Sequence, residues 1–550
     1  MGSAVLPGCR VLGLQTGSGH SRRLLAAGVV LALLATVCVS LTSCSSAARK
    51  DPPAAVSMVS QTHLPAAATS VLTGAQDVIA EGVAQKLFAS APVVVIASPG
   101  NPDDKAAARQ ALQIHAPLLL TSAGAAKPAS GDAVTTALRT GVRPVLDSAQ
   151  DAASVVSAAL RARVRALDPS VVLAVGISAK VLTAQLPGIR VVSNPATLPA
   201  TKAPTPLHQV ALLVPATGGN TATLAAATTA QVAGAQVIRV RGDDPRADPD
   251  VIAALSAARP QRVLAVGSGF GTASELASRI TVAETGVQLP GGGQVLFPNH
   301  LVVALYGHPG APSLGVLGQQ DLQASIARAE HVAAAYETLT SRRVVPALEI
   351  IATVAQASPG PDGEYSYESS VASLRPWVKR ATAAGLYVIL DLQPGRASLL
   401  AQAKVYQSLL KLPDVGLALD PEWKLGEGQL PLKQIGSVSI GEVNSVVTWL
   451  AALTARYRLP QKLLVLHQFQ LSMISDERAL DTRHDDLAIL FHMDGQGTPG
   501  DKEQTWDAIT KAAPPGMLFG WKDFYVKDHP MLDPQQTIDR TPELSMISYQ

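Results

Sequence analysis

Two carboxylates, Asp420 and Glu422, follow an apolar segment and stand two residues apart, with Trp423 directly after them. Side chains two apart on a strand point to one face, so these two carboxyl groups are expected to lie close together. Like charges held close raise the pKa of one carboxyl, which suits a general acid beside an ionised partner. We therefore expect Glu422 to donate a proton, Asp420 to tune it, and Trp423 to stack on a sugar ring.

Polar residues follow other apolar segments of the same region. Asp391 and Asp494 are candidates for a nucleophile, a base or the stabiliser of a charged intermediate. Any one such residue is equally a loop residue, but a buried core would not tolerate so many unpaired charges, and their recurrence argues for a shared site. The residues expected to bind substrate there, besides Trp423, are Tyr306, His308, Gln393, His467, Gln468, Gln470, His492, Trp521, Lys522 and Asp523.

The elements that must position these residues are eight short apolar segments separated by helical stretches. Such alternation over about 250 residues predicts a (β/α)₈ barrel, in which chemistry lies at the carboxyl ends of the strands. The expected strands are Leu301–Leu305, Val344–Ile350, Tyr387–Leu390, Val415–Leu419, Leu463–Leu466, Leu487–Leu490, Met517–Phe519 and Leu544–Ile547. Glu349 lies within the second of them.

The stretch from Asp414 to Glu422 resembles the strand-four motif of the chitinase-like glycoside hydrolase family 18, Asp-Gly-x-x-Asp-x-Asp-x-Glu. Asp414, Asp420 and Glu422 match the motif, whereas Val415 replaces its Gly and Ala418 its middle Asp. The resemblance implies that Glu422 is the general acid and that Asp420 assists it. It favours sugar-cleaving chemistry on an envelope polysaccharide.

Two alternatives stay open. A metal-dependent, deacetylase-type hydrolase would bring His308, His467, His492 and Asp494 together as ligands. The sequence has no closely spaced His pair among them, so we expect no metal and no other cofactor. A barrel that binds carbohydrate or cell wall without catalysis is the other alternative.

Residues 71–293 look like two related α/β units. Val263–Gly267 repeats Val172–Gly176 after 91 residues, and continuous apolar strands alternating with helices imply parallel sheets. A helical stretch followed by Ala116–Thr121, and closed by Val-Leu-Ala-Val-Gly, resembles the cell-wall-binding repeat family 2. That resemblance implies non-covalent binding of cell-wall polysaccharide.

The first 44 residues have the pattern of an export signal. Arg22 and Arg23 precede an apolar run from Leu24 to Leu41, which ends in Leu-Thr-Ser-Cys44. This ending resembles the lipobox of bacterial lipoproteins, which implies acyl chains such as palmitate on Cys44 and a protein anchored to the extracytoplasmic face of the cell membrane. Residues 45–70 are rich in Ala, Ser and Pro and predict a flexible tether.

The composition agrees with this organisation. The formal net charge is +2, so we expect no nucleic-acid partner. All three cysteines, Cys9, Cys38 and Cys44, precede the expected folded regions. The sequence thus predicts an α/β protein in four parts: signal 1–44, tether 45–70, parallel-sheet α/β repeats 71–293 and a (β/α)₈ barrel 294–550. Its oligomeric state stays open.

We expect Cys44→Ala to give an unprocessed or released protein instead of a lipidated membrane form, because the acyl chains attach to this thiol. Detergent partitioning and the intact mass of the mature chain check it, with Cys38→Ala as the matched control. A Cys44→Ala protein that partitions into detergent with the wild-type mature mass would contradict the prediction.

Overall fold

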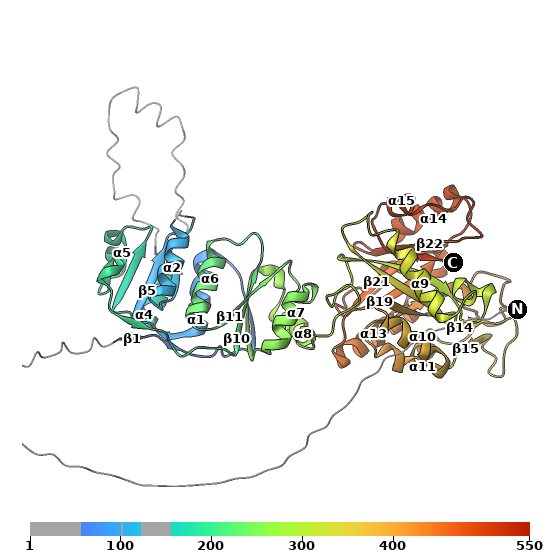
Figure 1. The fold of residues 1–550 in the computed structure, drawn as a ribbon, viewed down its shortest axis with the longest axis horizontal. Coiled ribbons are helices and arrows are strands. Elements are labelled where there is room, and N and C mark those ends of the chain that lie inside the picture. Colours follow the sequence, from blue (N-terminus) through green and yellow to red (C-terminus); the bar gives the residue numbers. More distant parts are fainter. Residues whose placement is uncertain (1–56, 101–102, 123–155) are drawn as a thin grey trace, which may run out of the picture. The chain divides into compact units, whose positions relative to one another are not determined.

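The computed structural model describes residues 57–100, 103–122 and 156–550 (Figure 1). The expected signal 1–44, with Cys44, and the first part of the expected tether lie outside these residues. The described residues belong to one compact unit, Val56–Gln550. None of the helices described is long and apolar enough to cross a membrane.

The first parallel sheet has the strand order β6-β5-β7-β8. Its central strand is completely buried and apolar, because helices cover both of its faces. The strands are β5 (Val93–Ala97), β6 (Leu118–Leu120), β7 (Val171–Val175) and β8 (Arg190–Val192). The helices are α1 (Gln76–Leu87), α2 (Asp104–Gln113), α4 (Ala158–Leu167) and α5 (Ala179–Gln185).

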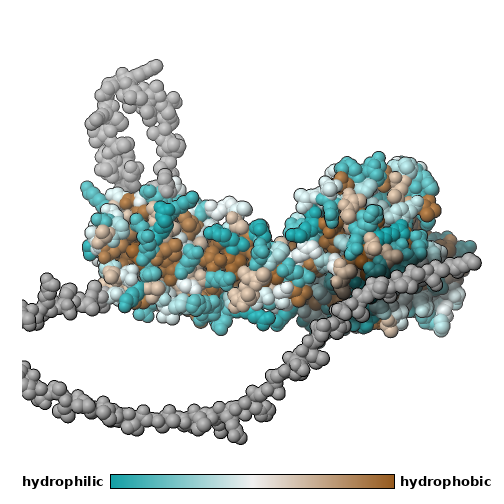
Figure 2. Space-filling view, viewed as in Figure 1, coloured by the Kyte–Doolittle hydropathy of each residue, from teal (hydrophilic) through white to brown (hydrophobic). Residues whose placement is uncertain are grey.

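The second sheet has the order β11-β10-β12-β3 and repeats the arrangement of the first three strands, whereas its edge strand β3 precedes both units in the chain. The two segments that are 91 residues apart take equivalent places, since Val172 pairs with Val94 and Leu264 with Leu212. The strands are β3 (Thr69–Leu72), β10 (Val210–Pro215), β11 (Gln236–Val240) and β12 (Arg262–Val266), and the helices are α6 (Thr221–Val232), α7 (Pro249–Ala258) and α8 (Ala273–Ala283). Figure 2 shows hydrophobic residues reaching the surface in the area of α2 and α6, which are rich in alanine.

The expected tether needs a correction, because its second half is part of the fold. β3 pairs in parallel with β12, and Met58–Val59 (β1) pairs with Thr201–Lys202 (β9). Gln61–Thr62 (β2) pairs with Phe88–Ser90 (β4). The exposed edge of β12 would otherwise present unpaired backbone groups, and four residues from the start of the chain satisfy it.

Eight parallel strands close into a barrel, which confirms the predicted fold class. The strand order is β13-β23-β22-β21-β19-β17-β16-β14, and pairing of β13 with β14 closes it. Each strand contains an expected apolar segment or most of it. The bounds are β13 (His300–Gly307), β14 (Arg343–Ala355), β16 (Tyr387–Leu392), β17 (Val415–Leu419), β19 (Lys462–Gln468), β21 (Leu487–Met493), β22 (Leu518–Asp523) and β23 (Leu544–Tyr549).

Helices separate most of the barrel strands. They are α9 (Leu322–Ala334), α10 (Val371–Ala383), α11 (Leu399–Val405), α12 (Gln407–Leu410), α13 (Ile440–Tyr457), α14 (Pro499–Ala512) and α15 (Pro534–Ile538). Between β19 and β21 the chain has only 3₁₀ turns and the two-residue strand β20 (Ile474–Ser475), which pairs with β18 (Val438–Ser439). A further strand, β15 (Ser366–Glu368), pairs antiparallel with β14.

Alternate residues of the barrel strands belong to two different buried clusters. The inner cluster includes Ala304, Ala347, Ile389, Ala418, Val465, Leu490 and Met546. The residues between them, such as Leu417 and Leu466, pack outward against the helices. This period of two fixes which side chains enter the barrel.

We expect a fragment of residues 65–296 to be more stable than one of residues 75–296, because only the first keeps β3 on the edge of β12, while both lack β1 and β2. The free energy of unfolding should differ by about 2–4 kcal/mol, since each backbone hydrogen bond contributes about 1 kcal/mol net. Urea unfolding followed by circular dichroism measures it. Equal stability of the two fragments would show that β3 contributes nothing.

Candidate active site

The inner apolar layer of the barrel is followed, two residues further along each strand, by a polar layer. The same alternation that places Ala418 and Val465 inside therefore directs the next inward residues to the carboxyl ends of the strands. These residues are Tyr306, Glu349, Asp391, Asp420, His467, His492, Lys522 and Ser548, and each is at most 3% exposed. Polar groups of such number at this end define a candidate active site.

His467 is the central contact of this layer. Its Nε2 lies 2.8 Å from Oε1 of Glu349 and 3.8 Å from Oδ1 of Asp391. Its Nδ1 lies 3.2 Å from Oδ2 of Asp494. Burial alone would lower the pKa of His467, but the charges of Glu349 and Asp494 raise it well above its ordinary value. The imidazole is therefore a buried cation at neutral pH.

Glu422 and Asp494 have their pKa values driven apart. Burial, and then the charge of Asp494, raises the pKa of Glu422 to about 7. Burial acts on Asp494 as well, but contact with His467 lowers the pKa of Asp494 below its ordinary value. One carboxyl thus keeps its proton up to about neutral pH, near a second carboxyl whose ionised form is favoured, the arrangement that acid–base catalysis needs.

Asp391 forms a second group with Tyr306, Gln393 and Lys522. The Tyr306 hydroxyl donates to Oδ2 of Asp391 at 2.9 Å and accepts from Nε2 of Gln393 at 3.3 Å. Nζ of Lys522 lies 3.4 Å from the centre of the Tyr306 ring. Burial raises the pKa of Asp391 to about 6, although the charge of His467 opposes this rise. Asp391 is therefore largely ionised at neutral pH.

The surroundings of Asp420 and His492 favour the uncharged form of each side chain. Burial, and then the charge of Glu422, raises the pKa of Asp420 well above its ordinary value. Burial, and then the charge of His467, lowers the pKa of His492 far below its ordinary value. Room for the His492 ring depends on Gly520, where a Cβ atom would lie 2.6 Å from its Cδ2.

Several polar atoms of the layer have no hydrogen-bond partner within the described part of the chain. They are Oε2 of Glu349, Oδ1 of Asp391, Asp420 and Asp494, both ring nitrogens of His492, Oγ of Ser548, and Nδ1 of His467, which has only its ion pair with Asp494. Buried polar groups are normally paired, so unpaired ones concentrated at one place suit a site that binds a polar ligand.

The structure places some expected site residues elsewhere. Gln468, Trp521 and Asp523 are one residue out of phase with the inward positions and point outward. Gln468 donates to Glu477, Trp521 packs on Trp506 and Arg540, and Asp523 accepts from Trp521 and Thr537. His308 contacts Ser369, and Gln470 is exposed. These positions give no support to their expected role in binding substrate.

Two members of the layer were not among the expected site residues. Glu349 lies within an expected strand, and Ser548 follows Met546 by two residues near the end of the chain. Counting two residues on from each inner apolar residue would have found both. Asp420 meets this rule, but β17 ends at Leu419, so Glu422 reaches the site from the 3₁₀ turn Pro421–Trp423 rather than from a strand.

The histidines and Asp494 do not form a metal centre in this structure. Among the residues it describes, no group of three or more His, Cys, Asp or Glu side chains is arranged to hold a metal ion. His467 is instead paired through both ring nitrogens with carboxylates, and His308 contacts Ser369.

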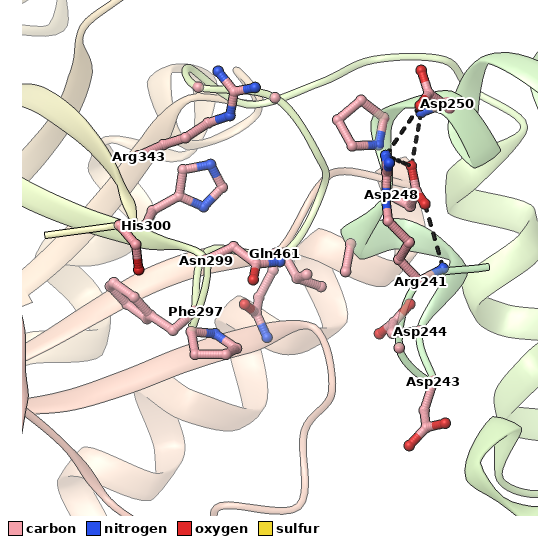
Figure 3. Close-up of a pocket in the computed structure, with 18 of the residues that line it drawn as sticks. Arg241, Asp243, Asp244, Asp248, Asp250, Phe297, Asn299, His300, Arg343 and Gln461 are labelled. Carbon is pink, nitrogen blue, oxygen red and sulfur yellow. Dashed lines mark hydrogen bonds and ion pairs between the residues drawn. The ribbon is translucent and has the colours of Figure 1, made fainter. Parts of the chain in front are cut away.

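A cavity of about 880 Å³ lies away from this site (Figure 3). It is lined by residues of the α/β region, such as Arg241, and by residues at the amino ends of barrel strands. His300 and Arg343 are the first residues of β13 and β14, and both line it. Its Arg241 is already paired with Asp248 at 2.9 Å and Asp250 at 3.0 Å. Catalytic groups of such barrels lie at the carboxyl ends of the strands, so we assign no chemistry to this cavity.

No family model and no curated protein matches the chain. The closed barrel fits a hydrolase-type fold, and the class of site is defined by its side chains: five carboxyl groups, with both protonated and ionised members, and one buried imidazolium.

We expect the Glu422 carboxyl to titrate near pH 7 and Asp494→Asn to lower that midpoint by about one pH unit, because a neighbouring negative charge is removed. The pKa exceeds its ordinary value of 4.5, so this group's contribution to stability is lost as pH rises through about 7. Carbon-13 NMR of labelled glutamate checks both, with Asp362→Asn as control. A midpoint near 4.5, or one that Asp494→Asn leaves in place, would contradict the assignment.

Proposed function

We propose that this protein is a glycoside hydrolase that uses Glu422 as its general acid. The observation that carries the proposal is the pair formed by Glu422 and Asp494, in which burial and His467 separate the pKa values of two neighbouring carboxyls. Most glycosidases use one protonated and one ionised carboxyl on either side of the scissile bond. The motif at Asp414–Glu422 supports the same role for Glu422.

In this mechanism Glu422 transfers its proton to the glycosidic oxygen as the bond from that oxygen to the sugar carbon breaks. Positive charge then develops on the sugar ring, and the ionised Asp494 stabilises it or attacks the ring carbon. Water then forms the new bond to that carbon, displacing Asp494 where it has attacked, and gives its proton to the ionised Glu422, which restores the acid. Asp391 supplies a second carboxylate, and neutral Asp420 keeps negative charge from accumulating around the acid. Neutral His492 and the unpaired carboxylate oxygens bind sugar hydroxyl groups.

We further propose that the enzyme is anchored to the extracytoplasmic face of the cell membrane by lipid on Cys44 and acts on an envelope polysaccharide. The lipobox-like sequence ending at Cys44 supports the anchor. The two α/β units share the arrangement of three parallel strands, and this repeat, together with the resemblance to cell-wall-binding repeats, supports a role in holding the enzyme on its polymer.

Glu422→Gln should lower kcat by about 10²–10⁴-fold and change substrate affinity little, because the amide keeps the shape of the side chain but has no proton to transfer. The test screens envelope glycans and aryl glycosides against the full chain and then compares kcat and KM. Asp494→Asn should also abolish most turnover, whereas Asp420→Asn should leave the pH–rate profile in place, because burial already favours the uncharged carboxyl of Asp420.

Glu368→Gln is the control, because Glu368 is an exposed glutamate on β15 outside the polar layer. A turnover that Glu422→Gln leaves unchanged would end the assignment of the acid and direct attention to Asp391 and Asp494. Binding of a glycan without turnover of any would favour a barrel that only binds carbohydrate.

A further inference from the structure

Glu422 also borders a cavity of about 320 Å³ outside the buried polar layer. Its other lining residues are Trp423, Leu425, Pro431, Leu432, Lys433, Gln434 and Ile435, so one loop supplies the whole wall. Most of these side chains are apolar. The side chain of Leu432 is 79% exposed, which makes it the most exposed of the large hydrophobic residues described.

The loop is held in place by the backbone of the acid itself. The N–H of Gly436 donates to the carbonyl of Glu422 at 2.7 Å. A Cβ atom on Gly436 would lie within 2.6 Å of the carbonyl oxygens of Pro421, Glu422 and Lys424, so no other residue fits there. The loop that forms the wall of the cavity is therefore fixed at Gly436 to the backbone of Glu422.

The backbone of Leu432 has a strained conformation, which holds its side chain in an exposed position. Its φ is +61°, in the left-handed region that bulky residues rarely adopt. The loop around it is ordered by hydrogen bonds, among them Gln434 Nε2 to the Leu430 carbonyl at 2.8 Å and Gly426 N–H to Gln429 at 2.7 Å. Strain and an exposed apolar side chain persist together where they serve a site.

Trp423 gives the cavity a mixed chemical character. It is half-buried, and its Nε1 has no hydrogen-bond partner among the described residues. An indole offers an apolar face with a donor at its edge, which fits a ligand that has an apolar face and polar groups at its rim. Lys433 and Gln434 add further polar groups at the cavity.

We propose that this cavity is the subsite for the leaving group and that it selects aglycones with an apolar face. The inference rests on the proposed role of Glu422: a general acid protonates the oxygen of the departing group, so that group lies on the side of the acid. Leu432 and Trp423 contact it there. Two sources supply this chemistry, an aryl or alkyl aglycone and the C–H face of a second sugar ring.

The test uses the full chain with Glu422→Gln, which keeps ligands intact, labelled with 5-fluorotryptophan. Replacing Trp423 by Phe assigns its fluorine resonance among those of the five tryptophans. The probes are methyl glycosides, phenyl glycosides and disaccharides of glucose, galactose and N-acetylglucosamine. Phenyl glycosides or disaccharides should shift the Trp423 resonance, and methyl glycosides should not. A shift with phenyl glycosides alone identifies an aryl or alkyl aglycone, whereas a shift with disaccharides identifies a sugar ring.

Leu432→Ala should weaken binding of the shifting probe by about tenfold, the effect of losing apolar contact in a binding pocket, and leave the methyl glycoside unaffected. Leu430→Ala is the matched control, because Leu430 is an exposed leucine of the same loop that does not line the cavity. Equal effects of the two variants, or a Trp423 resonance that no probe shifts, would overturn the proposal.

The two proposals fail in different ways. Turnover by the wild-type chain with an unresponsive Trp423 would leave the hydrolase and remove the subsite. A Leu432-dependent shift of Trp423 without any turnover by the wild-type chain would leave the binding site and remove the catalytic role of Glu422.

Discussion

The polar layer at the carboxyl ends of the barrel strands depends on one interaction, the burial of the His467 imidazolium among carboxyl groups. Each ionised carboxylate there loses its hydration, a cost of several kcal/mol that only an opposite charge at short range offsets. His467 supplies this charge to Glu349 and Asp494 through its two ring nitrogens. Burial is the first cause of the raised pKa values of Asp420 and Glu422, and the negative charges of neighbouring carboxyl groups add to the rise.

The period of two along each strand is what allows such a site to exist. The inward positions two residues before the polar layer are filled by small or branched apolar residues, including Ala304, Ala418 and Val465. These seal the interior, and the next inward residue can be polar because it lies at the open end. Outward positions at the same level serve a structural purpose instead: Lys502 pairs with Asp523 and Asp528, and this buried network holds the chain on either side of the end of β22.

The sequence could predict the features that neighbouring residues determine, and it could not predict those that depend on distant parts of the chain. The strands were predictable because each is an uninterrupted apolar segment, and Asp391, His467 and His492 were predictable because each follows such a segment. Trp521 and Gln468 stand beside true site residues in sequence but on the other face, and adjacency alone does not reveal the face. The pairing of β3 with β12 joins residues about 190 positions apart, and only the completed sheet reveals it.

Glu422, the proposed acid, lies just beyond the end of its strand, where the alternation of inward and outward residues stops. β17 stops at Leu419, and Pro421 begins a 3₁₀ turn, so Glu422 is freed from the strict alternation of the strand. It therefore remains half-buried, whereas Asp420 two residues earlier is 2% exposed. This difference in burial lets Glu422 face both the buried carboxylates that raise its pKa and the loop cavity beyond them. A proton donor needs both the carboxylates and the cavity, since the carboxylates set its pKa and the substrate enters through the cavity.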